Sequence, residues 1–240
     1  LHEKTILDCI SLNSPLFIEK PILSRLKNGA KILNLIKNSK IISYVGCNMR
    51  FHPALMFLKN NFKKYNLNIN EVNIYCGSYL PNWRPNTDFR KSYSSNSEMG
   101  GGVHLDLIHE IDYCLWLFGM PKSVRSIKSS KSNLNIKSTD YCRFDLEYKS
   151  FNASINLNYF RKDSKRELEI VSDNDTIIVD LINNTIYSKI KAKYIFRMEL
   201  DLMNSYINQF DYFLDCIENN RDTFNNFEFG LNTLKIALNE

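Results

Sequence analysis

The chain has 240 residues, of which 44% are hydrophobic and 24% are charged, and its 31 Lys and Arg against 26 Asp and Glu give a formal charge of +5. This composition excludes general disorder, and the length allows one large domain or one and a half smaller ones. The longest apolar run, residues 113–120, is far too short to span a membrane. The basic residues are dispersed among Ser, Asn and Asp instead of forming a stripe, so we expect neither a nucleic-acid nor a membrane partner.

Cysteine and glycine usage narrows the class of protein further. The 6 cysteines stand alone, without a C-x-x-C pair or the Cys/His spacing of a zinc site, so we expect reduced thiols, no metal site and a cytoplasmic location. The 8 glycines include a consecutive run at positions 100–102. None has the G-x-G-x-x-G or G-x-x-x-x-G-K spacing, so neither common phosphate-binding loop is present.

The first part of the chain alternates between helical and strand patterns. Helical spacing predicts a helix over residues 2–11, and the apolar run 15–18 predicts a buried parallel strand. A helix capped by Ser24 follows and ends near Asn38, and residues 41–47 form a second strand. This α-β-α-β order is that of half a doubly wound unit.

Strand patterns dominate the remainder, after a helix from Pro53 to about Tyr65. The predicted strands cover residues 71–80, 123–129, 141–148, 152–160, 166–171, 175–180 and 184–190. Several alternate with period two, which favours an antiparallel sheet with one wetted face. Residues 81–99 are irregular, and the predicted helices lie at 103–118, 199–219 and 227–239. The expected fold class is therefore α/β plus α+β: part of a doubly wound domain, then a large, mostly antiparallel sheet covered by helices.

The helix after the glycine run carries the most informative polar residues. Its apolar stripe includes His104, which we expect to be a packing residue, while Asp106, His109, Glu110 and Tyr113 share the other side. The glycines allow close backbone approach and leave N–H groups for an anion. A histidine within one turn of an aspartate is a plausible acid/base pair, because the carboxylate orients the imidazole. A solvated helix face is the other interpretation that the pattern allows.

Lys20 is the second candidate for chemistry. It follows the first predicted strand, and the carboxyl ends of parallel strands are where open α/β sheets bind ligands. There its ammonium group could hold a hydroxyl or carbonyl oxygen. Alternatively, Lys20 is a solvated side chain next to Glu19.

Three motifs occur together in order along the chain. They are Ile18-Glu19-Lys20-Pro21, then Val45-Gly46-x-Asn48-x-Arg50-Phe51-x-Pro53, then Gly-Gly-Gly followed by Asp106-x-x-His109-Glu110-x-Asp112. This set resembles the glucose–fructose oxidoreductase/inositol dehydrogenase (Gfo/Idh/MocA) family of NAD(P)-dependent sugar oxidoreductases over essentially the whole chain. The resemblance implies a Rossmann domain, followed by an α/β domain whose sheet often forms a dimer or tetramer face.

The resemblance also implies domain boundaries. Residues 1–50 would be a remnant of the dinucleotide-binding domain, and residues 51–240 a substrate-binding and oligomerisation domain, with the closing helix 227–239 a candidate to pack back on the first part. The family's glycine-rich turn and ribose-binding acid would precede residue 1. By this reasoning the N-terminal half of the Rossmann domain is missing, and the chain binds NAD or NADP weakly or not at all.

By the same resemblance, Lys20 and His109 are catalytic, with Asp106 as their substrate-binding neighbour. Glu19, Lys20 and Pro21 would contact the cofactor. Many members space the aspartate and histidine four residues apart, whereas here the gap is three, which makes the role of Asp106 less secure.

The stretch 79–93 resembles a loop of family members from bacterial surface-sugar pathways. Its aromatic residues and arginines suit a polar sugar or nucleotide-linked sugar, through stacking and bidentate pairing. The predicted substrate-binding residues are Arg50, Trp83, Arg84, Arg90, Tyr93, Asp106, Arg161 and Arg166. Alternatively, the loop is an ordered lid without ligand contacts.

The sequence thus predicts an NAD(P)-dependent sugar dehydrogenase or reductase that forms a homo-dimer or homo-tetramer. One alternative is a non-catalytic sugar-binding or oligomerisation domain derived from the family. A third hypothesis is a metal-dependent hydrolase that uses His104, Asp106 and His109, although these residues do not share a helix face.

Overall fold

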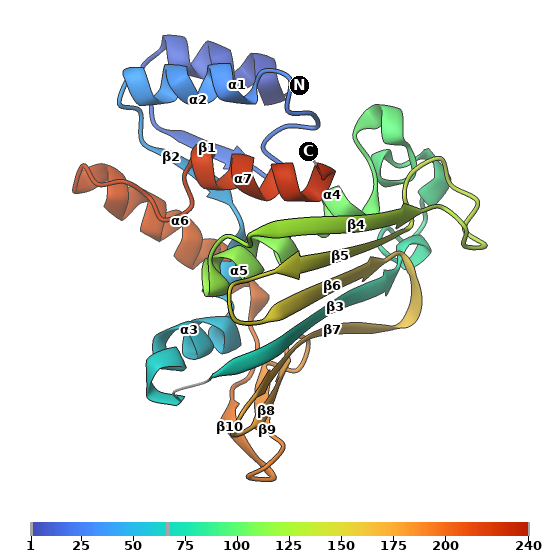
Figure 1. Ribbon diagram of the computed structural model, residues 1–240. Coiled ribbons are helices and arrows are strands. Elements are labelled where there is room, and N and C mark those ends of the chain that lie inside the picture. The colour runs from blue at the N-terminus through green and yellow to red at the C-terminus, as the bar shows by residue number, and fades with distance from the viewer. Residues whose placement is uncertain (1, 66–67, 240) are drawn as a thin grey trace.

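The computed structural model describes residues 2–65 and 68–239, which build two sheets of different kinds (Figure 1). The first part consists of α1 (His2–Ser11), β1 (Leu16–Glu19), α2 (Gly29–Asn38) and β2 (Ser43–Gly46). The two strands are parallel, and Glu19 at the end of β1 stands opposite Gly46 at the end of β2. The predicted α-β-α-β order is therefore confirmed, although the second helix begins five residues after Ser24, at Gly29.

The second part is built on an eight-stranded sheet with the strand order β10-β9-β8-β7-β3-β6-β5-β4. The strands are β3 (Ile69–Tyr79), β4 (Ser123–Ser129), β5 (Tyr141–Glu147), β6 (Asn152–Asn158), β7 (Phe160–Ser172), β8 (Thr176–Asp180), β9 (Thr185–Ser188) and β10 (Lys193–Arg197). Every neighbouring pair is antiparallel except β3 and β6, so the prediction of a large, mostly antiparallel sheet is confirmed.

Two strand predictions need correction. The edge strand β10 was not predicted, and β7 begins at Phe160 instead of Arg166. The polar segment 161–165 has no apolar alternation to mark it as a strand. Its partner β3 continues beside it, however, and Gly77 of β3 stands opposite Lys165.

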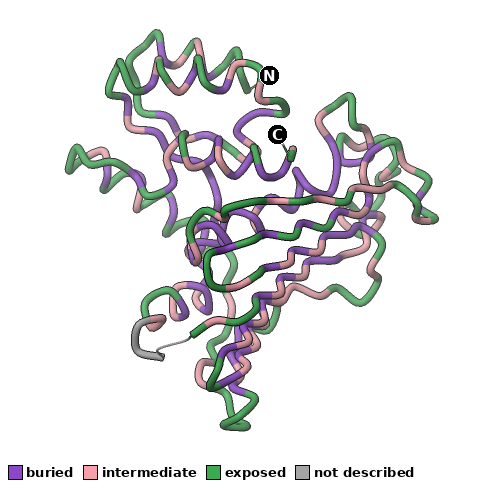
Figure 2. Tube along the Cα trace, in the orientation of Figure 1, coloured by how far each residue is buried: buried purple, intermediate pink, exposed green. Residues whose placement is uncertain are grey.

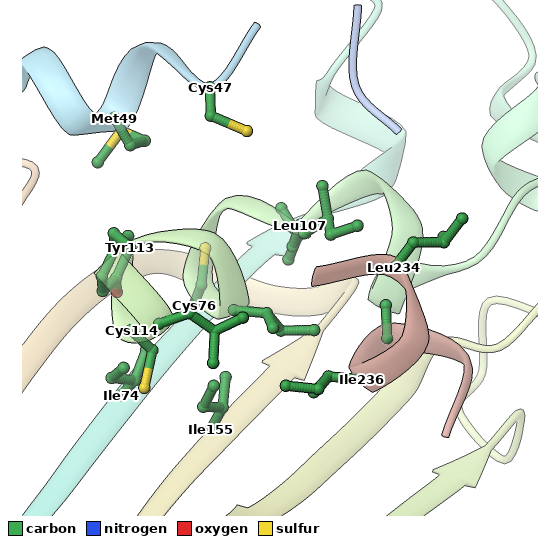
Figure 3. Packing of buried hydrophobic residues seen from close by; sticks show 14 of the residues in the cluster. Cys47, Met49, Ile74, Cys76, Leu107, Tyr113, Cys114, Ile155, Leu234 and Ile236 are labelled. Atoms are coloured by element: carbon green, nitrogen blue, oxygen red, sulfur yellow. The ribbon is translucent and has the colours of Figure 1, made fainter. Parts of the chain in front are cut away.

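The two faces of the sheet differ in their surroundings. Residues alternate along β5: Phe144 and Leu146 are buried, whereas Arg143 and Asp145 are exposed. The buried face lies under helices α4 (Val103–Asp106), α5 (His109–Phe118) and α7 (Phe227–Leu238), and the other face is open (Figures 1 and 2). Apolar residues of α5, α7 and the sheet join in one core cluster, part of which Figure 3 shows.

The remaining helices are α3 (Pro53–Tyr65), which follows a short 3-10 turn over Asn48–Phe51, and α6 (Leu202–Glu218). The closing helix α7 returns to the first part of the chain. At Gly230, an added Cβ would lie 2.7 Å from Cγ2 of Val45, so the helix backbone rests directly on β2. No helix within the described residues is long and apolar enough to cross a lipid bilayer.

Candidate functional site

The predicted helix over residues 103–118 is broken, and the break creates the candidate site. Helix α4 ends at Asp106 and α5 begins at His109. In a continuous helix the carbonyl of Asp106 would accept a hydrogen bond from the Glu110 N–H. Instead the Glu110 N–H donates to Leu107 O, and Nζ of Lys20 donates to Asp106 O at 2.7 Å. The lysine after β1 thus takes the place of a helical hydrogen bond, and His109 becomes the first residue of α5.

Asp106 is held from both sides. Its backbone carbonyl accepts the hydrogen bond from Lys20, while its carboxylate oxygen Oδ2 accepts one from the Tyr159 hydroxyl at 2.6 Å. Tyr159 follows β6 and is fully buried. Burial and the adjacent Asp106 carboxylate raise the pKa of the Tyr159 hydroxyl, which therefore stays protonated as a donor.

His109 lies in a positively charged environment. Burial lowers the pKa of its imidazole well below the usual range, and the positive charges of Lys20 and Arg166 lower it further. Its Nδ1 atom is buried and has no hydrogen-bond partner among the described residues. His109 is therefore neutral at neutral pH, and a neutral imidazole has one ring nitrogen that can accept a proton.

Glu110 and Arg166 form an ion pair next to this histidine. Nε of Arg166 donates to Glu110 Oε1 at 2.6 Å; the Glu110 side chain is fully buried and that of Arg166 is 24% exposed. Arg166 lies on β7 opposite Cys76 of β3, whose buried side chain marks the helix-covered face of the sheet. The arginine therefore extends from the sheet toward α5.

The predicted polar side of the helix is buried. Asp106 is 6% exposed, and Glu110 and Tyr113 are inaccessible to solvent. Interpretation as a solvated surface face is therefore wrong, because the break turns these residues toward the sheet and toward Lys20. His104 is buried, as expected of a packing residue. The described residues contain no group of His, Cys, Asp and Glu side chains arranged to hold a metal ion.

The glycine run allows close approach, but the approaching group is the chain's own loop. An added Cβ at Gly101 would lie 1.9 Å from the carbonyl oxygen of Tyr93, and the Gly101 N–H donates to Asn96 O. The Gly100 N–H donates to Ser97 O, and Gly100 and Gly102 have positive φ angles of 82° and 138°. Two of the three N–H groups are thus used within the loop, contrary to the expectation that they stay free for an anion.

The loop before the glycines reaches the site through one aromatic residue. The ring of Trp83 packs edge-on against Tyr159 at 5.3 Å between centroids, and its Nε1 donates to Ser78 Oγ at 2.9 Å. Tyr159 connects this contact to Asp106. Trp83 therefore borders the same cluster as Lys20 and His109.

The other predicted loop residues are exposed. The Arg84 guanidinium lies 5.1 Å from the centre of the Tyr93 ring, and Tyr93 is 44% exposed. Arg90 stacks on its neighbour Phe89 and pairs weakly with Asp88 at 4.0 Å. The two arginines thus contact residues of their own loop, while Tyr93 lies near enough to Tyr159 to raise its pKa. The role of these three residues in substrate binding stays a prediction.

Arg161 does not share a pocket with Arg166. It pairs with the exposed Asp163 at 2.7 Å, and its guanidinium lies 5.1 Å from the centre of the Tyr75 ring. Tyr75 alternates along β3 with residues of the buried face and therefore belongs to the open face. The expectation that Arg161 contributes to the pocket with Arg166 is corrected accordingly.

Arg50 is enclosed in the protein interior. Its guanidinium donates to both carboxylate oxygens of Asp112 at 2.8 Å and to Phe224 O at 3.0 Å, and it stacks on Phe229 at 4.1 Å. Because the side chain is inaccessible to solvent, none of its donors can reach a substrate. Arg50 joins the turn after β2 to α5 and to the segment before α7, and this structural role replaces the predicted one.

Glu19 and Pro21 border the site at the end of β1. The Glu19 carboxylate covers Gly46, with Oε2 3.3 Å from the position of an added Cβ. The Lys20–Pro21 peptide bond is cis. Among residues that matter to the site, sequence reasoning missed Tyr159, since a tyrosine at the end of an alternating strand carries no local signal of its partner.

Comparisons with known proteins agree with this architecture. The model of the oxidoreductase family, C-terminal alpha/beta domain (GFO_IDH_MocA_C), matches residues 66–239. Scyllo-inositol 2-dehydrogenase (NADP(+)) IolW of Bacillus subtilis (strain 168) is 26% identical over 154 residues, which are 64% of this chain. The chain spans about two fifths of that relative, 41% of its length.

Solved structures share the fold at lower identity. UDP-N-acetylglucosamine 3-dehydrogenase GnnA from Acidithiobacillus ferrooxidans has a TM-score of 0.79 at 17% identity, over 99% of this chain and 73% of that one. Aldose-aldose oxidoreductase from Caulobacter crescentus has a TM-score of 0.85 at 16% identity, over 100% of this chain and 72% of that one.

Proposed function

Because the chain belongs to the Gfo/Idh/MocA oxidoreductase family through its C-terminal alpha/beta domain, we propose that it is part of an NAD(P)-dependent enzyme that oxidises or reduces a sugar or sugar derivative. The observation that carries the proposal is that Lys20 meets Asp106 and His109, although 86 residues separate Lys20 from Asp106 along the chain. The names of the similar proteins, dehydrogenases of an inositol and of a nucleotide sugar, support the substrate class.

The residues around β1 fit one end of the cofactor. Glu19, Lys20 and Pro21 lie at the carboxyl edge of the parallel strands, where open α/β sheets bind ligands, and Gly46 leaves room at this edge for the Glu19 carboxylate. They would border the nicotinamide, which accepts or donates a hydride when it is bound. The 240 residues contain no G-x-G-x-x-G, so the proposal assigns none of them to the pyrophosphate.

His109 moves the proton in the proposed reaction. In the oxidation, its neutral imidazole takes the proton of the substrate hydroxyl, and in the reduction the imidazolium returns a proton to the carbonyl oxygen. Lys20 donates a hydrogen bond to the same oxygen and stabilises negative charge that develops there. Its bond to the Asp106 carbonyl uses one of three N–H groups and directs the ammonium toward the histidine.

The finer substrate assignment rests on the loop 79–93. Trp83 packs on Tyr159 beside the cluster, and Arg84, Arg90 and Tyr93 are solvent-accessible on the same loop. An aromatic ring with nearby arginines suits a sugar that carries a carboxylate or a nucleotide diphosphate, as in bacterial surface-polysaccharide metabolism. The exposed arginines are the groups that would contact such an anion.

The proposal also includes the oligomeric state of the protein and its location in the cell. We expect a homo-dimer or homo-tetramer, and the open face of the eight-stranded sheet is the surface available for it. All 6 cysteines are free, which supports a reducing, cytoplasmic environment.

Substitution of the two central residues tests the function. In the protein that carries this chain, Lys20→Ala and His109→Ala should each lower kcat at least about a hundredfold with NAD(P) and a panel of sugars and nucleotide sugars, the scale of acid/base catalysis. Arg143→Ala is the matched control, since Arg143 pairs with Asp145 on the open face of the sheet. Unchanged kcat in both site variants would show that the site is wrong.

Cofactor binding by the 240-residue chain is a second measurement. Without the dinucleotide fingerprint we expect no micromolar binding of NADH or NADPH in a fluorescence titration. Micromolar binding would contradict this expectation. Sugar binding without turnover by the protein that carries the chain would favour the non-catalytic alternative.

A further inference from the structure

The positive charges near His109 come from three different elements. Lys20 follows β1, Arg166 lies on β7, and the N-terminus of α5 begins at His109 itself. A helix N-terminus disfavours a positive charge on its first residue. The Asp106 carboxylate, which could balance these charges, accepts the hydrogen bond from Tyr159.

The position of Arg166 depends on Glu110. Strand β7 directs Arg166 to the helix-covered face, and the bond of 2.6 Å from its Nε to Glu110 Oε1 fixes the guanidinium beside α5. Glu110 follows His109 directly, so the ion pair is attached to the same turn of helix as the imidazole. Both members of the pair act on Cys76 and Tyr113, but of the two only Arg166 acts on His109.

No described carboxylate contacts the imidazole of His109. Its Nδ1 is buried without a partner, and so are Oε2 of Glu110 and Nη2 of Arg166. An imidazolium formed here would lack the acceptor that usually stabilises it. The geometry therefore favours the neutral form of His109 in the absence of substrate.

We propose that Glu110 and Arg166 are a positioning pair, in which Glu110 holds the Arg166 guanidinium beside His109 and Arg166 keeps the imidazole neutral and ready to accept a proton. Arg166, predicted from the sequence to bind substrate, thereby acts through His109. That a neutral His109 serves sugar oxidation rests on the proposed function, whereas its charge state can be measured without any activity.

Nuclear magnetic resonance titration of the imidazoles tests the pair. The chain has only 4 histidines, so a His109→Gln variant identifies the His109 signal. Arg166→Met should raise the pKa of His109 by about one unit or more, because it removes a cation and leaves the Glu110 carboxylate. Glu110→Gln frees the guanidinium but also removes a carboxylate, so it should raise the pKa by less than Arg166→Met does. Arg166→Lys, which keeps the charge, should stay near the wild type.

Two further variants make the result decisive. The double variant Glu110→Gln/Arg166→Met should give a rise smaller than that of Arg166→Met, and it carries the test if the single variant fails to fold, since it leaves no unpaired charge. Arg161→Met, on the same strand but the opposite face, should leave the His109 titration unchanged. A His109 titration that is the same in the wild type and in both variants lacking Arg166 would overturn the proposal. So would a His109 pKa that Glu110→Gln lowers, since Arg166 would then stay in place without Glu110.

Activity measurements distinguish a failure of this inference from a failure of the proposed function on which it rests. If the protein is a dehydrogenase, the acid limb of its kcat–pH profile should move with the His109 titration in each variant. If the titrations shift as expected but the protein oxidises no sugar, the pair is correct and the proposed function is wrong. Dehydrogenase activity with unshifted titrations would instead leave the function standing and refute the pair.

Discussion

Strand β7 carries two arginines, five residues apart, that have opposite surroundings. Arg166 faces the helices and pairs with the inaccessible Glu110, whereas Arg161 faces solvent and pairs with Asp163, which is 81% exposed. Arg161 lies against Tyr75 of the open face, whereas Arg166 stands opposite Cys76 of the covered face. Two arginines that look equivalent as candidate anion ligands thus have different roles, since only Arg166 can influence His109.

The difference shows how enclosure changes the effect of a residue. On the open face a charge is screened by water, so its pairing contributes little to stability or to the charge state of its neighbours. On the covered face the same charge acts over several ångströms on histidine, tyrosine and cysteine side chains. Three pairs of variants test this contrast, and each pair consists of one enclosed and one open position.

The largest effect is expected at the glycines. Gly101→Ala should destabilise the protein by more than about 4 kcal/mol, because a Cβ 1.9 Å from Tyr93 O forces the backbone of the loop to move. Gly119→Ala is the open counterpart, since no atom lies within 4 Å of an added Cβ there and only its φ of 82° is unfavourable. With ψ at −169° this conformation is one that essentially only glycine adopts, so the substitution should cost about 1–3 kcal/mol. Urea unfolding measures both, and equal losses would contradict the contrast.

The second largest change in stability is expected at the two arginines of β7. Arg166→Met should lower the free energy of unfolding by about 3 kcal/mol, since it leaves the buried Glu110 carboxylate without its partner. Arg161→Met should cause no measurable change, because Asp163 remains hydrated. Thermal or urea denaturation of the two variants measures these changes. A greater loss of stability from Arg161→Met than from Arg166→Met would contradict the assignment of the two side chains to their faces.

The smallest expected effect per residue is the dependence of the free energy of unfolding on pH. Burial lowers the pKa of His52 and of His104 to about 4 and that of His109 well below its usual value. Unfolded histidines titrate near 6.5, so between pH 6.5 and 4 the unfolded chain binds more protons and stability falls as the pH falls. Each buried histidine should contribute on the order of 1 kcal/mol between pH 7 and 5.

Urea unfolding at the two pH values checks this expectation. His104→Gln should reduce the dependence on pH, whereas the same substitution at the exposed His2 should leave it unchanged. A pH dependence equally reduced by both substitutions would show that burial is not its cause.

Local patterns were sufficient for most elements of the fold. The apolar run of β1, the helix from Pro53 to Tyr65 and the strand over 123–129 agree with the structure to within a residue or two. The predictions failed where contacts distant in sequence decide. A continuous apolar stripe predicted one helix over 103–118, but Lys20 takes the Asp106 carbonyl and divides it.

The predictions of site residues also succeeded where a local motif was sufficient and failed where distant contacts decide. Lys20, Asp106 and His109 were chosen from their motifs, and they do lie together. Arg50 belongs to an equally clear motif, yet it is enclosed by Asp112 and Phe224. Tyr159 had no motif at all, and its position beside Asp106 follows from the register of β6 and the loop after it.

The sequence by itself determined the family, the order of elements and the candidate residues, because spacing and periodicity are written in neighbouring positions. The tertiary structure decided which charges meet. Electrostatic effects depend on distance in space and on the exclusion of water, and neither is encoded in spacing along the chain. The +5 charge that looked evenly dispersed therefore contains two guanidinium groups with distinct tasks, the buried Arg50 as an internal link and the partly buried Arg166 beside His109.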